Sequence, residues 1–416
     1  GRPMDRAGDV SRKGPSRRSA AAACLVWPWA ARGVAAPATP DRAACPPWPL
    51  WEAFCQKFLQ ADGRVIDDQH KTRYTTSEGQ AYALFFALVA NDRARFDTLL
   101  RWTEVHLAAG DLTARLPGWR WGQRDSGEWG LVDANAASDA DLWMAYTLYE
   151  AARLWNAPVY RRTAHALLVR VEATEMVRLP RVGWMVLPGP AGFQTGAEQW
   201  RFNPSYLPLH QLRYFATAHP DGPWESTVAA LLSLLGAAAP RGFVPDWVEY
   251  SAQRGWHATA LSPAMGSYDA IRTYLWAGLV HRGDPARAEL LSRLGGMRAW
   301  LAAGHALPPQ QVQTHSGEGT GPAPPGFGAA LLPYLEALGA KDMVQTQLAQ
   351  VRQSSLPGGE TPGAGACAPS RYATALLGSP PTYFDQVLAL FGQGALEGRY
   401  RLGPAGALEP AWRTGR

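Results

Sequence analysis

The sequence predicts an all-α fold in which six helix pairs close into a ring. Apolar residues recur with helical spacing along most of the 416-residue chain, whereas the alternation typical of strands is hard to find. Gly, Pro and capping signals divide the chain into twelve candidate helices, near 48–61, 77–91, 93–109, 138–155, 157–176, 204–218, 222–238, 267–282, 284–303, 325–339, 341–353 and 382–395.

A repeat supports the ring. Four segments share one layout, a helix start carrying an acidic or hydroxylated side chain, and recur about every 60 residues: 76–80, 137–141, 203–206 and 266–269. In each repeat such a helix is followed by a short loop and then by a more ordinary amphipathic helix. Helices that lie side by side and point the same way would bring these side chains to one rim.

The first two helix starts have the spacing of a capping box, in which a serine and the side chain three residues later satisfy free backbone N–H groups. The pairs are Ser77 with Gln80 and Ser138 with Asp141. Glu78 and Asp139 are therefore expected on the first turns of their helices.

An open helical solenoid is the alternative to a closed ring. A solenoid needs polar caps on its terminal repeats, and the last predicted helix, 382–395, is strongly apolar. Closure is therefore favoured. The loops before residues 77, 138, 204 and 267 are rich in Trp, Gly and Pro, and they would all lie at the same end of the ring.

Charge is concentrated at the N-terminus. Residues 1–43 hold seven Arg and one Lys against three Asp, which accounts for the whole net charge of +5, so 44–416 sum to zero. This balance disfavours a nucleic-acid partner. The basic start followed by an apolar, Ala-rich stretch predicts a targeting segment at 1–43 and a periplasmic or secreted protein. A disordered or cloning-derived tail is the alternative.

The remainder is interpreted as one domain, 44–400, with a flexible insertion at about 354–381 and a C-terminal tail at 401–416. No other run is long and apolar enough to span a bilayer. Three cysteines lie outside the targeting segment, and a Cys45–Cys55 or Cys55–Cys367 bridge has no support from spacing, so all three are treated as structural or free.

Several chemistries lack their signatures. The nine His form no metal-ligand motif, the Gly-rich segment 317–321 lacks the spacing of a phosphate loop, and no nucleophile elbow is present. No cofactor or metal is therefore predicted. What remains is carboxylates together with aromatics. Among 18 Trp, Trp119, Trp121, Trp184 and Trp200 fall in loops, where they either line a sugar-binding groove or plug the ends of the ring.

Six ordered motifs match a known family. They are 63–67, 75–80, 137–145, 201–208, 245–247 and 267–272, and the match covers about residues 46–400. On these residues the chain resembles glycoside hydrolase family 8, and within it the periplasmic endo-β-1,4-glucanases that accompany bacterial cellulose synthases. The resemblance implies an (α/α)6 barrel, hydrolysis of internal β-1,4-glucosidic bonds with inversion, a β-1,4-glucan substrate and an association with a cellulose synthase complex.

The resemblance also implies roles for single residues. Glu78 corresponds to the general acid, Asp269 to the general base and Asp139 to the carboxylate that holds the sugar at the cleavage subsite. Tyr206 corresponds to the tyrosine that helps to position the water, and Arg272 to the arginine that steadies the base. Tyr268 and the four loop tryptophans complete the expected substrate-binding set.

Each assignment has an alternative. Asp141 is interpreted as a capping partner only, Asp269 could pair structurally with an arginine one turn on, and Asp246 and Glu128 are rival carboxylates. At the level of function, the alternatives are a xylan- or chitosan-cleaving relative and a non-catalytic glucan-binding component of a cellulose-export assembly. Chitosan is cationic and would favour a more acidic groove than these loops suggest.

Overall fold

The computed structural model describes residues 48–69, 71–355 and 376–414. The chain divides into two units, 1–42 and 43–416, and the fold below is that of the second. The expected targeting segment, 1–43, lies outside the described residues, and so does most of the expected insertion, 356–375. No helix in the described part is long and apolar enough to cross a membrane.

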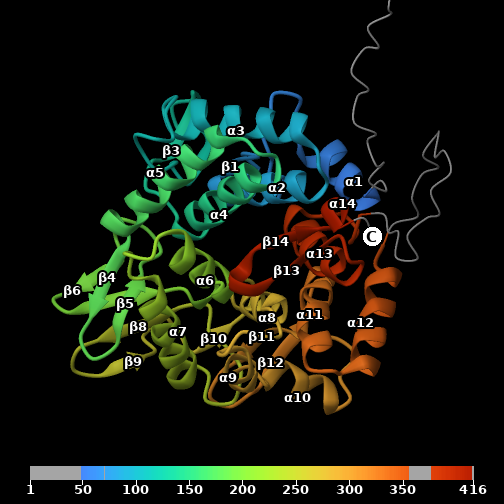
Figure 1. The fold of residues 1–416 in the computed structure, drawn as a ribbon. Helices are drawn as coiled ribbons and strands as arrows, with labels where there is room; N and C mark the ends of the chain where they lie inside the picture. The colour runs from blue at the N-terminus through green and yellow to red at the C-terminus, as the bar shows by residue number, and fades with distance from the viewer. Residues whose placement is uncertain (1–47, 70, 356–375, 415–416) are drawn as a thin grey trace, which may run out of the picture. The chain divides into compact units, whose positions relative to one another are not determined.

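The fold is predominantly helical, as predicted (Figure 1). The helices are α1 (Pro49–Phe58), α2 (Ser77–Val89), α3 (Arg93–Leu107), α4 (Ser138–Leu154), α5 (Pro158–Thr174), α6 (Leu209–Ala218), α7 (Trp224–Ala238), α8 (Ala270–Leu279), α9 (Arg287–Arg293), α10 (Gly296–Ala302), α11 (Pro325–Ala337), α12 (Lys341–Gln353), α13 (Tyr383–Leu396) and α14 (Ala411–Thr414). Two 3-10 turns, η1 (Pro204–Tyr206) and η2 (Pro404–Gly406), precede α6 and β14.

Alternate helices pack against one another in sequence order. The pairs in contact are α2 with α4, α4 with α6, α6 with α8, α8 with α11, and α11 with α13. Phe391 of α13 then meets Phe86 of α2 at 4.6 Å between ring centroids. The intervening helices pack on the outer side of their predecessors, α3 on α2 and α5 on α4, while α1 packs on α13 (Figure 1).

In the described part of the chain, fourteen short strands occupy the connections, where the sequence showed no clear alternation. They are β1 (Thr75–Thr76), β2 (Arg120–Gln123), β3 (Trp129–Asp133), β4 (Met176–Leu179), β5 (Gly183–Val186), β6 (Gln194–Gly196), β7 (Gln199–Phe202), β8 (Val248–Ser251), β9 (Gly255–His257), β10 (Met265–Gly266), β11 (Pro309–Gln313), β12 (Gly319–Pro322), β13 (Tyr400–Leu402) and β14 (Leu408–Pro410). None exceeds five residues, which is too short for a two-residue period to stand out.

All strand pairings are antiparallel. The sheets run β1-β2-β3, β4-β5, β6-β7-β8-β9, β10-β11-β12 and β13-β14. Strands β1, β3, β7 and β10 precede α2, α4, η1 and α8, so short antiparallel strands lead into the helix starts that were singled out in the sequence.

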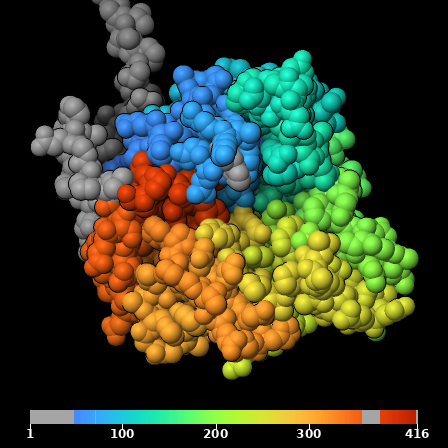
Figure 2. All heavy atoms as spheres, turned by 180° about the vertical axis from the view of Figure 1, so that it is seen from behind, coloured from blue at the N-terminus to red at the C-terminus, as the bar shows by residue number. Residues whose placement is uncertain are grey.

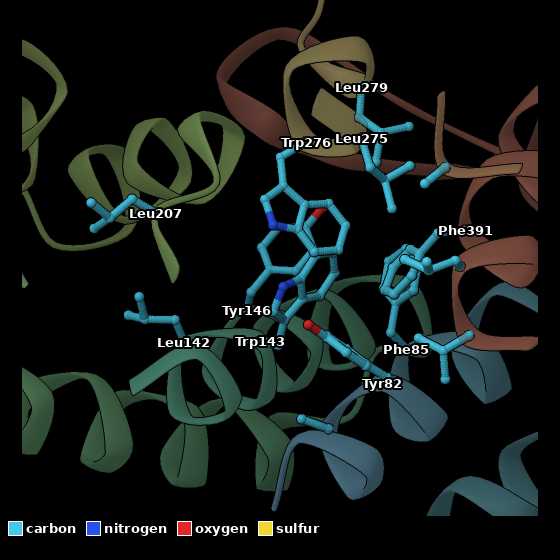
Figure 3. Close-up of a cluster of buried hydrophobic side chains, with 14 of the residues drawn as sticks. Tyr82, Phe85, Leu142, Trp143, Tyr146, Leu207, Leu275, Trp276, Leu279 and Phe391 are labelled. Atoms are coloured by element: carbon cyan, nitrogen blue, oxygen red, sulfur yellow. The ribbon is translucent and has the colours of Figure 1, made fainter. Parts of the chain in front are cut away.

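Aromatic side chains from four alternate helices fill the centre. The ring of Trp143 on α4 lies 5.0 Å from Phe85 of α2, 5.1 Å from Trp276 of α8 and 5.1 Å from Phe391 of α13. Figure 3 shows these rings meeting from different sides of the unit. Because each ring is buried, the helices that approach one another here are held by one continuous apolar core.

The helix starts differ in detail from the predicted capping boxes. The Thr76 side chain caps α2 by accepting from Gly79 N at 3.0 Å. Gln80 instead bonds inward to Val65 N, at 2.7 Å. At α4 neither Ser138 nor Asp141 makes a capping bond. The helices begin where predicted, but the side chains expected to cap them point into the core.

Two predicted helices are broken. The segment 204–218 forms η1 and then α6, because Pro208 lacks the N–H that a continuous helix would use. The segment 284–303 forms α9 and α10. A Cβ placed on Gly296 would lie 2.7 Å from the carbonyl carbon of Gly242, so the chain turns where it crosses another backbone closely.

The expected C-terminal tail, 401–416, is packed as far as it is described. Leu402 and Leu408 are buried. Leu408 N donates to Glu150 Oε2 of α4 at 2.6 Å, and Tyr146 Oη donates to Gly406 O at 2.7 Å. The apolar residues of this short segment find their partners on α4, a contact that local sequence does not reveal.

Candidate active site

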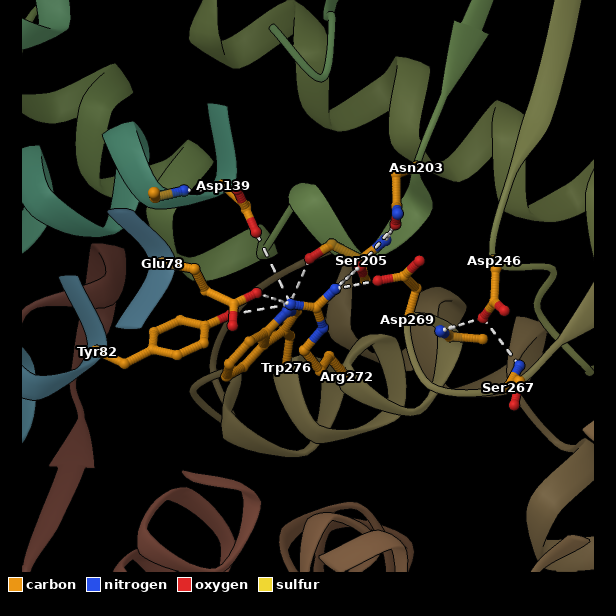
Figure 4. A network of polar contacts seen from close by, with 12 residues as sticks. Glu78, Tyr82, Asp139, Asn203, Ser205, Asp246, Ser267, Asp269, Arg272 and Trp276 are labelled. Carbon is orange, nitrogen blue, oxygen red and sulfur yellow. Dashed lines mark hydrogen bonds and ion pairs between the residues drawn. The ribbon is translucent and has the colours of Figure 1, made fainter. Parts of the chain in front are cut away.

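Three carboxylates from separate helix starts converge at one end of the helical unit. Glu78 and Asp139 lie in the first turns of α2 and α4, and Asp269 immediately precedes α8. In Figure 4 their carboxyl groups turn toward a single guanidinium, that of Arg272. Figure 2 shows the molecule from behind, and in this view the N-terminal segments, in blue, lie next to later segments of the chain, in yellow and orange.

Arg272 connects all three carboxylates. Its Nη1 lies 2.5 Å from Glu78 Oε2 and 3.7 Å from Asp139 Oδ2, and its Nη2 lies 2.5 Å from Asp269 Oδ1. The guanidinium forks, so each terminal nitrogen serves a different helix start. Asp269 therefore does pair with the arginine one turn on, as the structural alternative supposed. That arginine is itself shared with Glu78, which makes the pair part of a larger site.

Two hydroxyl groups complete the surroundings of Arg272. Nη2 donates to Ser205 Oγ at 3.1 Å, and Nη1 lies 3.3 Å from Tyr82 Oη. The Arg272 side chain is only 4% exposed. Burial acts to lower its pKa, but the surrounding acidic groups, including Tyr82 and Glu78, raise that pKa well above the ordinary value. The arginine therefore stays charged.

Asp139 is the most deeply buried of the three carboxylates. Burial, followed by the negative charge of Glu78, raises the pKa of Asp139 to about 8, although Arg272 opposes this shift. Asp139 Oδ1 also accepts from Ala140 N at 2.8 Å. The group of three carboxylates and one guanidinium therefore retains a proton at neutral pH.

Tyr206 extends this group on one side. The Arg272 guanidinium carbon lies 5.9 Å from the Tyr206 ring centroid, and Trp247 meets the same ring edge-on at 6.2 Å. Arg201 in turn covers Trp247 at 4.0 Å and is held by Ser262 Oγ at 2.9 Å. An arginine and aromatic array thus leads away from the carboxylates.

Comparison with known proteins identifies the family. The sequence profile of the glycosyl hydrolases of family 8 matches residues 29–398. The chain belongs to glycosyl hydrolase family 8. An endoglucanase of Xanthomonas axonopodis pv. citri (strain 306) is 45% identical to it over 370 residues, 89% of this chain and 91% of that protein. An endoglucanase of Escherichia coli (strain K12) is 41% identical over 371 residues, 89% and 93% of the two chains.

A solved structure agrees with this membership. The endo-1,4-D-glucanase of Vibrio fischeri ES114 superposes with a TM-score of 0.75 at 36% sequence identity, covering 88% of this chain and 99% of that one. The resemblance to family 8 that the sequence motifs indicated is thereby confirmed. Membership of family 8 does not by itself assign roles to individual residues, and the geometry of the site bears on those roles.

The four predicted loop tryptophans fall into different environments. Trp119 is half-buried, Arg120 stacks on its ring at 5.2 Å, and its carbonyl accepts from Ser77 N beside Glu78. Trp121 packs edge-on against Trp102 of α3 at 5.2 Å. Of the four, only Trp119 is hydrogen-bonded to the residue next to Glu78.

The other two tryptophans lie on strands of the antiparallel sheets. Trp200 is 7% exposed and packs against Tyr250 in the sheet β6-β7-β8-β9. Trp184 is 37% exposed on β5, opposite Arg178. Tyr268, next to Asp269, is 44% exposed and lies edge-on to Phe327 at 5.3 Å.

The alternative carboxylates occupy distinct places. Asp246 approaches the start of α8 from the loop before β8 (Figure 4). Glu128 is exposed at the tip of the β2–β3 hairpin, 3.9 Å from Arg124. Asp141 is fully buried and interacts with Glu175 at the end of α5. Asp141 is therefore not the capping partner of Ser138 that the sequence predicted, because its carboxyl group is buried inside the fold.

Sequence reasoning overlooked Tyr383. Its hydroxyl lies 3.4 Å from Glu78 Oε1, and it is buried at the first position of α13. Thr382 caps that helix by accepting from Asp385 N at 3.3 Å. The threonine followed three residues later by an acidic residue is a further helix-start signal, and it could have marked the adjacent tyrosine. Among the described residues no group of three or more His, Cys, Asp or Glu could hold a metal ion.

Proposed function

We propose that the protein is an endo-1,4-β-glucanase, which hydrolyses internal β-1,4-glucosidic bonds of cellulose or related glucans. The observation that carries the proposal is the joining of Glu78, Asp139 and Asp269 through Arg272 at one end of the helical unit. Carboxylates supply both proton transfers of glycoside hydrolysis. The endoglucanase names of the relatives at 41–45% identity support the substrate class.

In the proposed mechanism Glu78 donates a proton to the glycosidic oxygen as the bond from that oxygen to the anomeric carbon breaks. Asp269 accepts a proton from a water molecule as the water oxygen attacks the same carbon from the opposite face, so configuration inverts. Tyr206 helps to position this water, and Asp139 holds the sugar at the cleavage subsite. Tyr383 would orient the Glu78 carboxyl.

Proton placement is central to this scheme. Glu78 Oε2 lies 2.5 Å from Arg272 Nη1 when no glucan is bound. A general acid must carry a proton when the leaving oxygen arrives. The raised pKa of Asp139 means that the site already holds a proton nearby at neutral pH. We infer that this proton rests on Glu78 in the productive complex, while Arg272 remains paired with Asp269.

The proposal also includes the topology of the helical unit, the location of the protein and its biological role. The helix contacts support six pairs closed as an (α/α)6 barrel, with α1 serving as the outer partner of α13. The basic, Ala-rich start of the sequence supports a periplasmic or secreted location. The sequence motifs shared with the family subgroup support a role in bacterial cellulose biosynthesis, in functional association with a cellulose synthase complex.

The first experiment measures release of reducing ends from carboxymethylcellulose, xylan and chitosan, with Glu78→Gln as the matched control. The wild type should act on carboxymethylcellulose. The activity of the variant should be about 10²–10⁴-fold lower, because its amide has no proton to donate to the leaving oxygen. Binding of a cello-oligosaccharide should persist in the variant. Preference for xylan or chitosan would replace the substrate assignment, and glucan binding without cleavage would support the non-catalytic alternative.

Stereochemistry is tested separately. Proton NMR of fresh hydrolysate from a β-glucan should show the α-anomer first if Asp269 activates water. Early appearance of the β-anomer would contradict the role given to Asp269 and leave the substrate assignment intact.

A further inference from the structure

We propose that Asp246 is a positioning residue for the base Asp269: it caps helix α8 from a distant loop and thereby leaves the Asp269 carboxylate free to face Arg272 and the substrate. The inference rests on the proposed function, because it assumes that Asp269 acts on water. It assigns a task to a carboxylate that is close to the site but has no bond to Arg272 in the contacts described above.

Helix α8 is capped by a residue other than the one that immediately precedes it. The first turn of a helix has free backbone N–H groups, which normally donate hydrogen bonds to the side chain of the residue just before the helix. Asp269 occupies that residue but makes no capping bond, and its Oδ1 bonds to Arg272 Nη2 instead. Asp246 Oδ1 caps the helix start instead, because it accepts hydrogen bonds from Ser267 N at 2.8 Å and from Ala270 N at 2.7 Å. These two bonds bracket Asp269 in the chain (Figure 4).

The loop that carries Asp246 is held firmly against this helix start. Asp246 N donates to Met265 O at 2.8 Å. A Cβ on Gly266 would lie 2.0 Å from Val244 O, so only glycine allows the two backbones to approach so closely. Ser267 Oγ also donates to Gln310 O of β11 at 2.7 Å. The capping carboxylate is therefore anchored on both sides of its contact.

The neighbouring residue acts on the other group that would position the water. Trp247 meets the ring of Tyr206 edge-on at 6.2 Å and is covered by Arg201 at 4.0 Å. Two consecutive loop residues thus support Asp269 and Tyr206, which come from α8 and η1. A shift of this loop would move both groups relative to the sugar.

Electrostatics favour the same role. Burial, followed by the charge of Asp269, raises the pKa of Asp246 to about 6, while the bonds from Ala270 N and Ser267 N oppose the shift. Asp246 is therefore mostly ionised at neutral pH. An ionised carboxylate makes stronger bonds to backbone N–H groups than a neutral oxygen does, and it lies at the positive end of the helix.

The test compares Asp246→Ala, Asp246→Asn and Asp246→Glu at pH 7, well below the melting temperature, with a cello-oligosaccharide as substrate. The Ala variant has no acceptor, so kcat should fall by about 10- to 100-fold while KM changes by less than about 2-fold. The Asn variant keeps an acceptor of the same reach and should retain kcat within about 3-fold. The Glu variant keeps the charge but displaces the acceptor and should resemble Ala.

Asp92→Ala is the control for simple destabilisation. Asp92 caps the outer helix α3 by accepting from Arg95 N at 3.1 Å, outside the set of catalytic and substrate-binding residues proposed above. It should lower the melting temperature without lowering kcat. Normal kcat in Asp246→Ala, or in the Glu variant if the Ala protein does not fold, would overturn the inference. An inactive wild type would instead contradict the proposed function, and this inference with it.

Discussion

Arg272 is the residue on which the three carboxylates depend. An isolated buried guanidinium would be costly, and three buried or half-buried carboxylates without a cation would repel one another. Bonds of 2.5 Å to Glu78 and Asp269 satisfy both requirements at once. A lysine at this position would offer a single ammonium, which cannot place two separated donors toward two helix starts.

Trp119 and Trp200 offer a residue-scale comparison. Trp119 is half-buried beside the start of α2, whereas Trp200 is 7% exposed and packs on Tyr250. If Trp119 stacks on sugar, Trp119→Ala should raise KM for long cello-oligosaccharides by about 3- to 10-fold and change KM for short ones less. Trp200→Ala should cost about 3–5 kcal/mol of stability because it opens a cavity.

The measurements are KM against chain length and the melting temperature of each variant. Equal loss on all chain lengths together with a lower melting temperature in Trp119→Ala would show that Trp119 is a structural plug. Selective loss on long chains in Trp200→Ala would mean that the buried position of Trp200 does not describe its role.

At the scale of elements, helix α4 carries two carboxylates with opposite surroundings. Asp139 faces Arg272, while Asp141, two residues on, is buried against Glu175 at the end of α5. Burial raises the pKa of Glu175 to about 8 and that of Asp141 well above its ordinary value. Two buried carboxyl groups are stable beside each other only while they hold a proton between them.

This pair predicts a pH dependence of stability. The folded-state pKa of Glu175, about 8, lies above the ordinary glutamate value of 4.5. The stabilisation of the folded state by protonated Glu175 is therefore fully present below about pH 4.5 and is lost as the pH rises through about 8. Glu175→Gln supplies an amide donor that does not titrate. Relative to the wild type, the variant should gain melting temperature as the pH rises from 5 to 8.

Thermal denaturation of both proteins at pH 5, 6.5 and 8 checks this expectation. Groups away from this pair are common to both proteins, so the difference between them reports on Glu175 together with the Asp141 carboxyl beside it. A difference that stays constant across this range would show that Glu175 does not take up a proton on folding.

Prediction from sequence worked well for the existence of helices and less well for their ends and connections. The start of α2 was placed correctly, but Thr76 rather than Ser77 caps it, because Gln80 is drawn into bonds with Val65 N and Thr103 Oγ1. Both residues were suitable caps by type. Which one caps depends on the loop and outer helix that surround it.

At the scale of the whole helical unit, the two ends of the described sequence meet. Helix α1 packs on α13, and the segment from Tyr400 onward packs on α4. Glu150 of α4 accepts from Leu408 N and from Tyr214 Oη, both at 2.6 Å, and pairs with Arg153. The last described residues therefore complete the partners of a fully buried carboxylate.

Truncation tests this dependence. Removal of residues 400–416 takes away three buried apolar side chains, Tyr400, Leu402 and Leu408, each worth about 1.5–3 kcal/mol, and leaves Glu150 without one donor. The melting temperature should fall by roughly 10 °C or more. Truncation after Thr414 is the control and should behave as the full chain does. Unchanged melting and activity after the longer deletion would show that this segment is dispensable.

The helical class, the positions of most helices, the family resemblance and the carboxylates at the helix starts could all be predicted from the sequence. These features depend on periodicity, caps and short motifs, which act over a few residues. The tertiary structure decided the rest. It joined Glu78 to Arg272 across 194 positions of sequence, packed Trp121 against Trp102 and Trp200 against Tyr250, and placed Tyr383 beside Glu78. Such contacts depend on which helices pack together, and local residue patterns do not encode that choice directly.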